Sequence, residues 1–260
     1  MSMTFLTGAS SGIGRSLARR IAADGEPIVV VARRQALLDS LVEEVEAAGG
    51  RALAIGCDVT NRAAVHAAVR QAEARFGPTT TLIANAGGAS PTDAMHFRAQ
   101  QIVDVVNLNL FGVANCIEAV LPAMLERRAG HLVATGSLAA YRGLPAAGAY
   151  SAAKAALTNL MESLRIDQRS TGIDVTVVAP GFVQTKPGKK KSRPFRLELE
   201  TATALIHRAI KRRTPYYAFP KSLLVLTWLG WALPAPVYDR MLAGRGPKVK
   251  SSEPRSTPSW

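Results

Sequence analysis

Cysteine is scarce in this chain of 260 residues, which contains only Cys57 and Cys116. Neither has a second cysteine or a histidine at a spacing typical of metal or redox sites, and each sits in an apolar pattern. Both are therefore expected to be small core residues. Nothing in this cysteine usage points to an oxidising compartment, a structural disulfide or a metal site.

A secretory leader is not expected either, because Met1–Leu6 runs directly into a glycine-rich motif. The apolar stretch Ser222–Leu233 has only 12 residues, whereas a helix that spans a bilayer needs about 20. These two absences predict a cytoplasmic protein, with a peripheral position at a membrane left open by the apolar stretch.

Acidic residues are few in the last third of the chain. Residues 186–260 contain 16 Lys and Arg against four acids, whereas residues 1–185 contain 16 bases and 15 acids. The net charge of +13 therefore resides almost entirely in the last third. Specific nucleic-acid binding is not expected, because no DNA- or RNA-binding motif accompanies the bases, and charge alone gives only non-specific affinity.

The first 185 residues alternate short β-branched runs with longer segments of helical periodicity, which is typical of βαβ units. Strands are expected at Thr4–Thr7, Pro27–Ala32, Arg51–Asp58, Thr81–Asn85, Gly130–Thr135 and Asp174–Ala179. Helices are expected at Gly12–Asp24, Gln35–Ala48, Arg62–Phe76, Ile102–Arg127 and Ala149–Ser170. Several strands are nearly continuous apolar runs, as strands buried on both faces are. Right-handed crossovers then predict an α/β fold with a single Rossmann-like, doubly wound parallel sheet and helices on both faces.

The character of the sequence changes after Pro180. Residues 1–185 are expected to form a dinucleotide-binding and catalytic core. Residues 186–243 are expected to add a substrate loop and a basic, apolar, helical C-terminal extension of the same domain, with a helix at Leu197–Arg213. The polar residues 244–260 are expected to be a disordered tail.

A glycine-rich turn follows the first expected strand and opens the first expected helix. Its sequence is Thr7-Gly8-Ala9-Ser10-Ser11-Gly12-Ile13-Gly14. Glycines there let the backbone turn tightly and approach a pyrophosphate, which sits at the helix N-terminus. The strand–turn–helix context favours a dinucleotide site over a plain glycine-rich turn. The candidate contacts are Gly8, Ser10, Ser11, Gly12, Ile13 and Gly14.

Tyr150 and Lys154 lie near the start of the expected helix Ala149–Ser170. Positions i and i+4 share one helix face, so the Lys154 ammonium can approach the phenol. A neighbouring cation lowers the pKa of a tyrosine and makes it a usable general acid or base near neutral pH. Tyr141 lacks such a partner, because Pro145 occupies its i+4 position.

These motifs together resemble the classical short-chain dehydrogenase/reductase family over residues 3–185. The glycine turn matches its T-G-x-x-x-G-x-G element, and Asn85-Ala86-Gly87 matches its N-A-G element. Ser137 lies 13 residues before Tyr150, which is the family's serine-to-tyrosine spacing.

Two further positions fit the same family. Asn109 falls where the family keeps a catalytic asparagine. Pro180-Gly181, with Thr185 four residues later, matches its P-G-x-x-x-T element.

The resemblance implies roles for four catalytic residues. Tyr150 would exchange the proton with the substrate oxygen, and Ser137 would orient that oxygen. Lys154 would hold the nicotinamide ribose and lower the Tyr150 pKa, and Asn109 would support a water in the proton relay. The cofactor would supply the hydride chemistry. The resemblance also implies cofactor contacts from Tyr150, Lys154, Asp58, Val59, Asn85, Ala86, Gly87, Pro180, Gly181, Val183 and Thr185.

The second expected strand ends in Val31-Ala32-Arg33-Arg34, with no carboxylate. NAD-binding members of such folds place an acid there for the ribose 2′-hydroxyl, whereas an arginine pairs with a 2′-phosphate. Arg33 matches the basic position of NADP-preferring relatives and predicts NADP(H) over NAD(H). Ser11 departs from the pattern, since some of those relatives have Lys or Arg there. Asp58 matches an adenine-contacting aspartate and is also placed to cap the next helix.

The apolar stretch Ser222–Leu233 and the basic loop Lys186–Arg196 allow three interpretations. The stretch can pack over the substrate pocket or a subunit interface, or it can lie at an anionic membrane surface with bases facing lipid. Docking of an acidic partner such as an acyl carrier is the third. The first two favour a small-molecule hydrophobic alcohol or carbonyl substrate, whether lipid-like, steroid-like or long-chain.

The sequence therefore predicts an NADP(H)-dependent oxidoreductase that transfers a hydride between the nicotinamide and an alcohol or carbonyl, with carbonyl reduction as the expected direction. A non-catalytic NADP(H)-binding scaffold and a peripheral membrane interaction protein are the alternatives. The scaffold is disfavoured because the four catalytic positions are all occupied by competent residues. The family resemblance further implies a homo-oligomer built on the two long helices Ile102–Arg127 and Ala149–Ser170.

Overall fold

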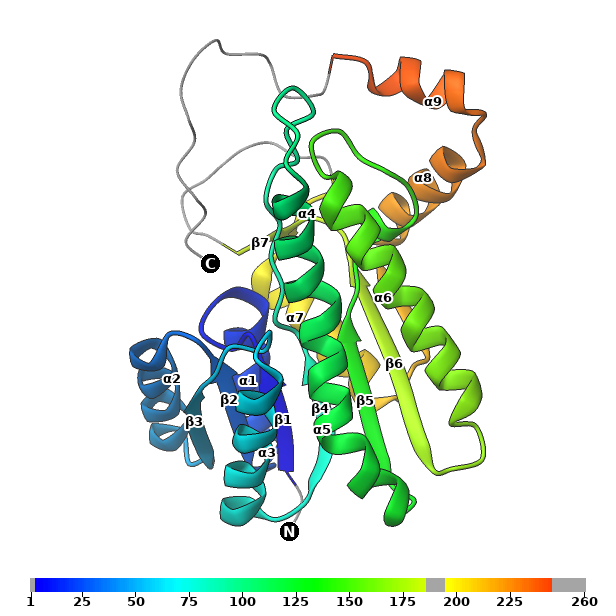
Figure 1. Ribbon diagram of the computed structural model, residues 1–260. Coiled ribbons are helices and arrows are strands. Elements are labelled where there is room, and N and C mark those ends of the chain that lie inside the picture. The colour runs from blue at the N-terminus through cyan, green and yellow to red at the C-terminus, as the bar shows by residue number, and fades with distance from the viewer. Residues whose placement is uncertain (1–2, 186–194, 245–260) are drawn as a thin grey trace.

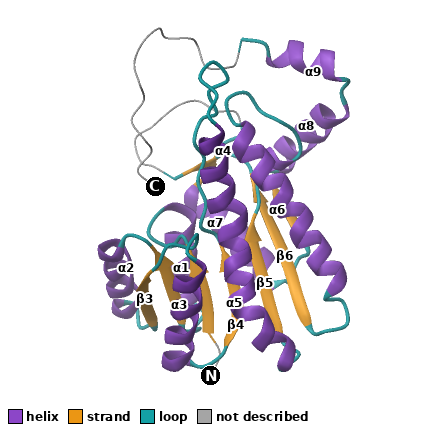
Figure 2. Cartoon of the chain, in the orientation of Figure 1, coloured by secondary structure: helices purple, strands orange, loops and turns teal. Residues whose placement is uncertain are grey.

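The computed structural model describes residues 3–185 and 195–244. Helices cover both faces of one parallel sheet, and two helices extend the chain at its C-terminal side (Figures 1 and 2). This arrangement confirms the predicted doubly wound α/β fold.

The main sheet has seven strands in the order β3-β2-β1-β4-β5-β6-β9, and every neighbouring pair is parallel. The strands are β1 (Met3–Thr7), β2 (Ile28–Ala32), β3 (Ala52–Gly56), β4 (Thr79–Ala84), β5 (Gly130–Thr135), β6 (Ile173–Pro180) and β9 (Tyr216–Phe219). The order reverses between β1 and β4. In open α/β sheets, ligands bind in the crevice outside the carboxyl ends of the strands at such a switch point.

The helices lie in two layers. They are α1 (Gly12–Ala23), α2 (Gln35–Ala47), α3 (Arg62–Phe76), α4 (Ala99–Val106), α5 (Gly112–Glu126), α6 (Gly148–Asp167), α7 (Leu199–Lys211), α8 (Lys221–Ala232) and α9 (Ala235–Leu242). Residues of α3, α5 and α6 share one buried cluster with the sheet, and residues of α1, α2 and α7 share another. The sheet therefore has a core on each face.

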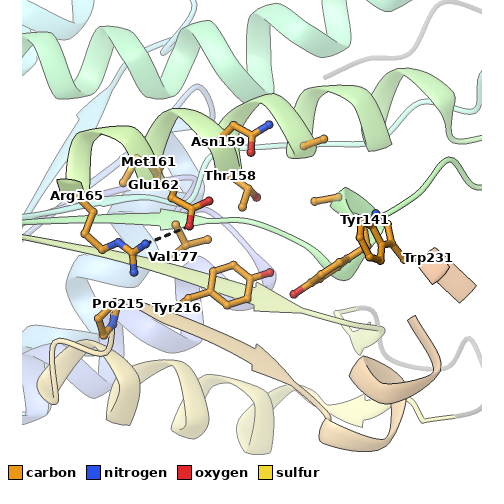
Figure 3. Close-up of a pocket in the computed structure, with 12 residues that line it drawn as sticks. Tyr141, Thr158, Asn159, Met161, Glu162, Arg165, Val177, Pro215, Tyr216 and Trp231 are labelled. Atoms are coloured by element: carbon orange, nitrogen blue, oxygen red, sulfur yellow. Dashed lines mark hydrogen bonds and ion pairs between the residues drawn. The ribbon is translucent and has the colours of Figure 1, made fainter. Parts of the chain in front are cut away.

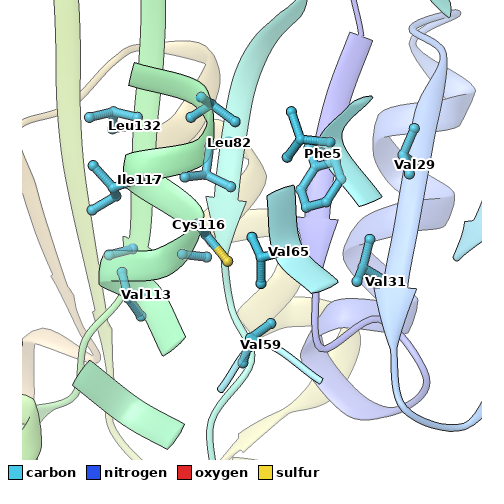
Figure 4. Packing of buried hydrophobic residues seen from close by; sticks show 14 of the residues in the cluster. Phe5, Val29, Val31, Val59, Val65, Leu82, Val113, Cys116, Ile117 and Leu132 are labelled. Carbon is cyan, nitrogen blue, oxygen red and sulfur yellow. The ribbon is translucent and has the colours of Figure 1, made fainter. Parts of the chain in front are cut away.

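Both cysteines belong to the first of these cores. Figure 4 shows Cys116 and Val65 facing Phe5 and Leu82 of the sheet. Cys57 and Cys116 are free and buried, and burial raises the pKa of the Cys116 thiol to about 12. The expectation of small core residues is confirmed for both.

The predicted helix Ile102–Arg127 is wrong as a continuous α-helix. A π-helical segment, Asn107–Phe111, separates α4 from α5. The whole run Ala99–Glu126 is apolar and long enough to cross a membrane by length and composition. It packs against α3, α6 and β4, as a core helix does.

Two details beyond Pro180 differ from expectation. The short strand β9 (Tyr216–Phe219), which lies between Pro215 and Pro220, was not predicted. The helix expected at Leu197–Arg213 begins at Leu199, because Leu197 and Glu198 form β8, which pairs with β7 (Val183–Gln184). Most of the basic loop, residues 186–194, and residues 245–260 of the tail lie outside the described residues.

Candidate active site

The glycine turn joins β1 to α1 at the switch point. Gly8 and Gly12 have φ angles of +70° and +56°, in the left-handed region that favours glycine. A Cβ at Gly14 would lie 2.3 Å from the Gly8 carbonyl oxygen, so only glycine fits. The Ser11 side chain makes no capping hydrogen bond at the N-terminus of α1. The N-terminal N–H groups of this helix can therefore receive an anion such as a pyrophosphate.

Asn85, which follows β4, makes hydrogen bonds to the ends of β1 and β5. Its Nδ2 donates to the Thr7 carbonyl at 3.1 Å, and its Oδ1 accepts from the Thr135 hydroxyl at 3.2 Å. The Thr7 hydroxyl also accepts from the backbone N–H groups of Asn85 and Ala86. The Asn85-Ala86-Gly87 element is thus fixed beside the glycine turn.

Arg34 and Thr185 approach the glycine turn from other elements. Arg34 Nη2 donates to the hydroxyls of Ser10 and Ser11 at 2.7 and 3.0 Å. A Cβ at Gly12 would lie 3.2 Å from Thr185 Cγ2. The structure thus brings the predicted residue Thr185 to the turn and adds Arg34. The only sequence signal for Arg34 was its place beside Arg33.

Two other arginines, Arg33 and Arg15, lie close to the glycine turn or to β2 in the sequence. Arg33 is exposed just after β2. The side chain of Arg15 bridges to α2, where it contacts the Leu37 carbonyl, Ser40 and Glu44. Arg15 therefore joins α1 to α2.

Asp58 is half-buried beyond the end of β3, and Val59 next to it is buried. Asp58 Oδ1 accepts from the backbone N–H and the hydroxyl of Thr60 at 2.9 and 2.8 Å. The capping role considered for Asp58 is wrong, because Asn61 caps α3 by accepting from the Ala64 N–H at 3.0 Å. The Asp58 carboxylate, which stabilises this turn, could still contact the adenine of a bound cofactor.

Asn109 is fully buried within the π-helical segment. Its Nδ2 donates to the carbonyls of Gly88 and Val105 at 2.8 and 2.9 Å, and its Oδ1 accepts from the Gly88 N–H at 3.3 Å. π-Helical turns inside α-helices often occur at functional sites. Here the turn connects Asn109 to the backbone that follows Asn85-Ala86-Gly87.

Ser137 lies close enough to Tyr150 to affect its phenol. Ser137 begins the turn after β5, where its Oγ accepts from the Ala139 N–H at 3.1 Å. Tyr150 lies near the start of α6 and packs against Val105 and Ala153. Burial raises the Tyr150 pKa above its usual value of 10, and the hydrogen bond from Ser137 opposes that rise.

Lys154 is buried one turn after Tyr150. Its ammonium donates to the Thr135 carbonyl at 2.7 Å and lies 5.8 Å from the centre of the Tyr150 ring. Burial lowers the Lys154 pKa to about 8. The expectation that Lys154 lowers the Tyr150 pKa is not met, because the ammonium points to the β5 carbonyl and burial dominates at the phenol.

Gly87 shows how closely these groups converge. A Cβ at this position would lie 2.8 Å from Asn109 Oδ1 and 3.4 Å from Lys154 Nζ. Asn109, Lys154 and the Asn85-Ala86-Gly87 element therefore border the same small space. The last predicted element, Pro180-Gly181, ends β6, where the Gly181 N–H donates to the Phe219 carbonyl at 2.8 Å.

A separate cavity of about 500 Å³ lies between α6 and β9 (Figure 3). Tyr141, Tyr216 and Trp231 line it together with polar residues of α6. The four candidate catalytic residues are not among its lining residues. Within the described ranges, no cluster of His, Cys, Asp and Glu could hold a metal ion.

A glycine turn, an uncapped helix N-terminus and a Ser–Tyr–Lys group at the carboxyl edge of a parallel sheet define a dinucleotide-dependent oxidoreductase. The short chain dehydrogenase family model matches residues 2–194. The chain belongs to the short-chain dehydrogenase/reductase family. It is an oxidoreductase that acts on CH–OH or C=O groups with an NAD(P)(H) cofactor.

Three known proteins illustrate the likeness. An uncharacterized oxidoreductase of Myxococcus xanthus is 39% identical over 236 residues, covering 90% of this chain and 93% of the relative. The ketoacyl reductase HetN of a Nostoc species is 34% identical, covering 80% and 75%. The crystal structure of an actinorhodin polyketide ketoreductase variant with NADPH aligns with a TM-score of 0.78 at 26% identity, covering 85% of this chain and 97% of that one.

Proposed function

We propose that this chain is an NADP(H)-dependent reductase of apolar carbonyl compounds. The observation that carries the proposal is the convergence of Ser137, Tyr150, Lys154 and Asn109 beside the glycine turn, at the carboxyl edge of the sheet. The cofactor contacts named from the sequence, from Gly8 to Thr185, are part of the same proposal.

A bound NADP(H) would supply or accept the hydride at the substrate carbon. Tyr150 would give a proton to the substrate oxygen as charge develops there, with Ser137 orienting that oxygen. Because burial raises the Tyr150 pKa, the phenol holds its proton at neutral pH and acts as the acid that carbonyl reduction needs. Lys154, with a pKa of about 8, would carry a positive charge near neutral pH and bind the ribose. Asn109 would hold a water that resupplies the proton.

The NADP(H) preference rests on charge at the end of β2. Arg33 and Arg34 stand where NAD-binding relatives have an acid, and Arg34 already reaches the glycine turn. A 2′-phosphate there would receive charge-assisted hydrogen bonds. The NADPH in the related polyketide ketoreductase structure supports this preference.

The apolar substrate is inferred from the loops that follow β4 and β5. Met95, Phe97 and Leu144 are large apolar residues that these loops leave exposed. The relative that is a ketoacyl reductase supports a carbonyl on an acyl chain. A homo-oligomer built on α5 and α6 and a cytoplasmic location stay predictions.

The proposal is tested by NADPH consumption with methyl ketones of increasing chain length, for the native chain and for Tyr150→Phe. Turnover should rise with chain length. It should fall by at least about a hundredfold in the variant, because positioned acid catalysis contributes on that scale. Tyr141→Phe is the matched control, since Tyr141 is a neighbouring tyrosine without a lysine partner, and it should keep activity.

Three results would contradict parts of the proposal. Unchanged turnover in Tyr150→Phe would remove the catalytic assignment. Faster turnover of small polar ketones would exclude the apolar substrate. NADPH binding without turnover of any compound would favour the scaffold alternative.

A further inference from the structure

Helix α8 is apolar on all sides. Residues 222–238 contain no charged side chain and include α8 from its second residue onward. Its one hydroxyl-bearing residue after Ser222 is Thr227, whose hydroxyl donates to the Leu223 carbonyl at 2.8 Å. A helix that is apolar all round is normally buried all round.

Among the described residues of the chain, only those on one side of α8 cover it. Leu223 and Leu224 pack against Leu138, Ala179 and Ala218. The rest of its surface is open, with Trp228 53% and Leu229 60% exposed. Trp231 borders the cavity between α6 and β9 and is still 65% exposed. Val225 and Leu226 are also exposed beside them. This face lacks the polar residues that a water-facing helix carries.

Helix α9, which follows α8 in the chain, also exposes apolar side chains. None of its residues is buried, and Val237 and Met241, four residues apart, are exposed on one side. Tyr238 donates its hydroxyl to the Gly143 carbonyl at 2.8 Å. We name Val225, Leu226, Trp228, Leu229, Trp231, Val237 and Met241 the α8–α9 face.

Arg142 fixes the α8–α9 face to the protein. Its guanidinium donates to the carbonyls of Gly230 and Leu233 at 2.6 and 2.8 Å, and it lies 3.9 Å from the centre of the Tyr238 ring. The face is therefore held in place at the end of the molecule toward which the strands run (Figure 1).

The charges around the face are mostly positive. Lys221 and Arg240 are exposed at its two ends, with Asp239 as the acid between them. Two exposed tryptophans flanked by bases are the composition of helices that lie in the interface of anionic membranes.

We propose that the α8–α9 face docks onto the surface of an anionic lipid bilayer. The helices project from the body (Figure 1), and a bilayer accepts a projecting apolar surface without a complementary groove. Docking would bury the uncovered side of α8, and the bases at its ends would meet lipid phosphates. This binding goes beyond the proposed function, because it does not require catalysis.

The test is flotation of the full chain with vesicles of phosphatidylcholine mixed with the anionic lipid phosphatidylglycerol. The native chain should float with these vesicles. Trp228→Gln/Trp231→Gln should bind on the order of a hundredfold more weakly, because two large apolar side chains no longer enter the interface. Ile166→Gln is the matched control, since Ile166 is 63% exposed on α6, and it should bind like the native chain.

Fluorescence gives a second readout. In a Trp260→Phe chain, the only tryptophans are Trp228 and Trp231. Their emission should shift to shorter wavelength with anionic vesicles and should be quenched by brominated lipid, and the shift should shrink as salt screens the charges.

Several outcomes would overturn the proposal. They are no flotation, equal flotation of the double tryptophan variant, and equal binding to vesicles of phosphatidylcholine alone. If the native chain does not bind vesicles but forms a dimer that requires Trp228 and Trp231, the α8–α9 face binds a second copy of the chain instead. Circular dichroism of each variant shows that lost binding is not lost folding. NADPH turnover, which the proposed function requires, is measured separately and does not decide docking.

Discussion

Arg33 and Arg34 follow β2 directly, and both are exposed, but only Arg34 contacts the glycine turn. The serines that Arg34 binds are themselves candidate phosphate contacts. Arg34 is therefore held at the glycine turn, whereas Arg33 has no such contact with the turn among the hydrogen bonds of the described residues. Arg33 was named from its family position, whereas Arg34 is identified by its contacts in the structure.

Replacing these arginines tests the cofactor preference. Arg34→Ala should raise the Kd for NADPH by roughly tenfold to a hundredfold, because a hydrogen bond to a charged group is lost. The Kd for NADH should stay nearly unchanged, because that cofactor lacks the 2′-phosphate. Both variants are measured by titration calorimetry, and Arg33→Ala shows whether Arg33 also binds the 2′-phosphate. Equal loss for both cofactors in Arg34→Ala would mean that Arg34 merely shapes the turn.

The sequence named four candidate catalytic residues that lie together in the structure, but it did not predict all their contacts. Spacing and motifs were enough to name Ser137, Tyr150 and Asn109. Residues that follow parallel strands meet at the carboxyl edge of the sheet, so their proximity depends on the topology and not on the intervening side chains. The direction of the Lys154 ammonium was missed, because the Thr135 carbonyl that it meets comes from a different element. Such contacts depend on packing distances that no local pattern contains.

Arg142 acts at the scale of elements, since it joins the loop after β5 to α8 and α9. The guanidinium donates hydrogen bonds to carbonyl groups at the end of α8. The last carbonyls of a helix have no N–H partner within the helix. It also stacks on Tyr238 of α9. Few other contacts hold α9, because none of its residues is buried.

Arg142→Leu should loosen α8 and α9 while leaving the sheet intact. Amide hydrogen exchange in residues 221–242 should quicken by on the order of tenfold, because a charged hydrogen-bonding group worth that factor is removed. Amides of β1, β4 and β5 should keep their protection. Arg70→Leu is the control, since Arg70 is exposed on α3, away from both helices. Unchanged exchange in 221–242 would show that apolar packing of Leu223 and Leu224 alone holds the two helices.

Elements with strong periodicity or long apolar runs were predictable, and short or interrupted ones were not. The bounds of α3 and β5 match the expected residues. The π-helical segment was missed because Asn107–Phe111 has an apolar pattern that fits a continuous helix equally well. Strand β9 was missed because four residues between two prolines resemble a loop until β6 offers them a partner.

At the scale of the whole molecule, charge and burial set the response to pH. The net charge of +13 makes the chain repel itself as acids become protonated. One buried histidine adds to this acid sensitivity. His131 lies in β5, is 3% exposed, and shares a hydrogen bond of 2.8 Å with the Thr176 hydroxyl of β6.

Burial lowers the His131 pKa to about 4, with Arg213 lowering it further and Asp174 opposing that effect. In the unfolded chain the pKa returns to about 6.5, so between these two values the unfolded state binds more protons. The contribution of His131 to the free energy of unfolding is therefore fully present above about pH 6.5. It falls by about 3 kcal/mol as the pH drops toward 4. His131→Gln can keep the hydrogen bond to Thr176 and should flatten the fall in unfolding free energy across that window, measured by urea denaturation at each pH. His96→Gln, whose parent side chain is 80% exposed, should keep the native slope. An identical slope in His131→Gln would mean that acid destabilises the molecule through its net charge alone.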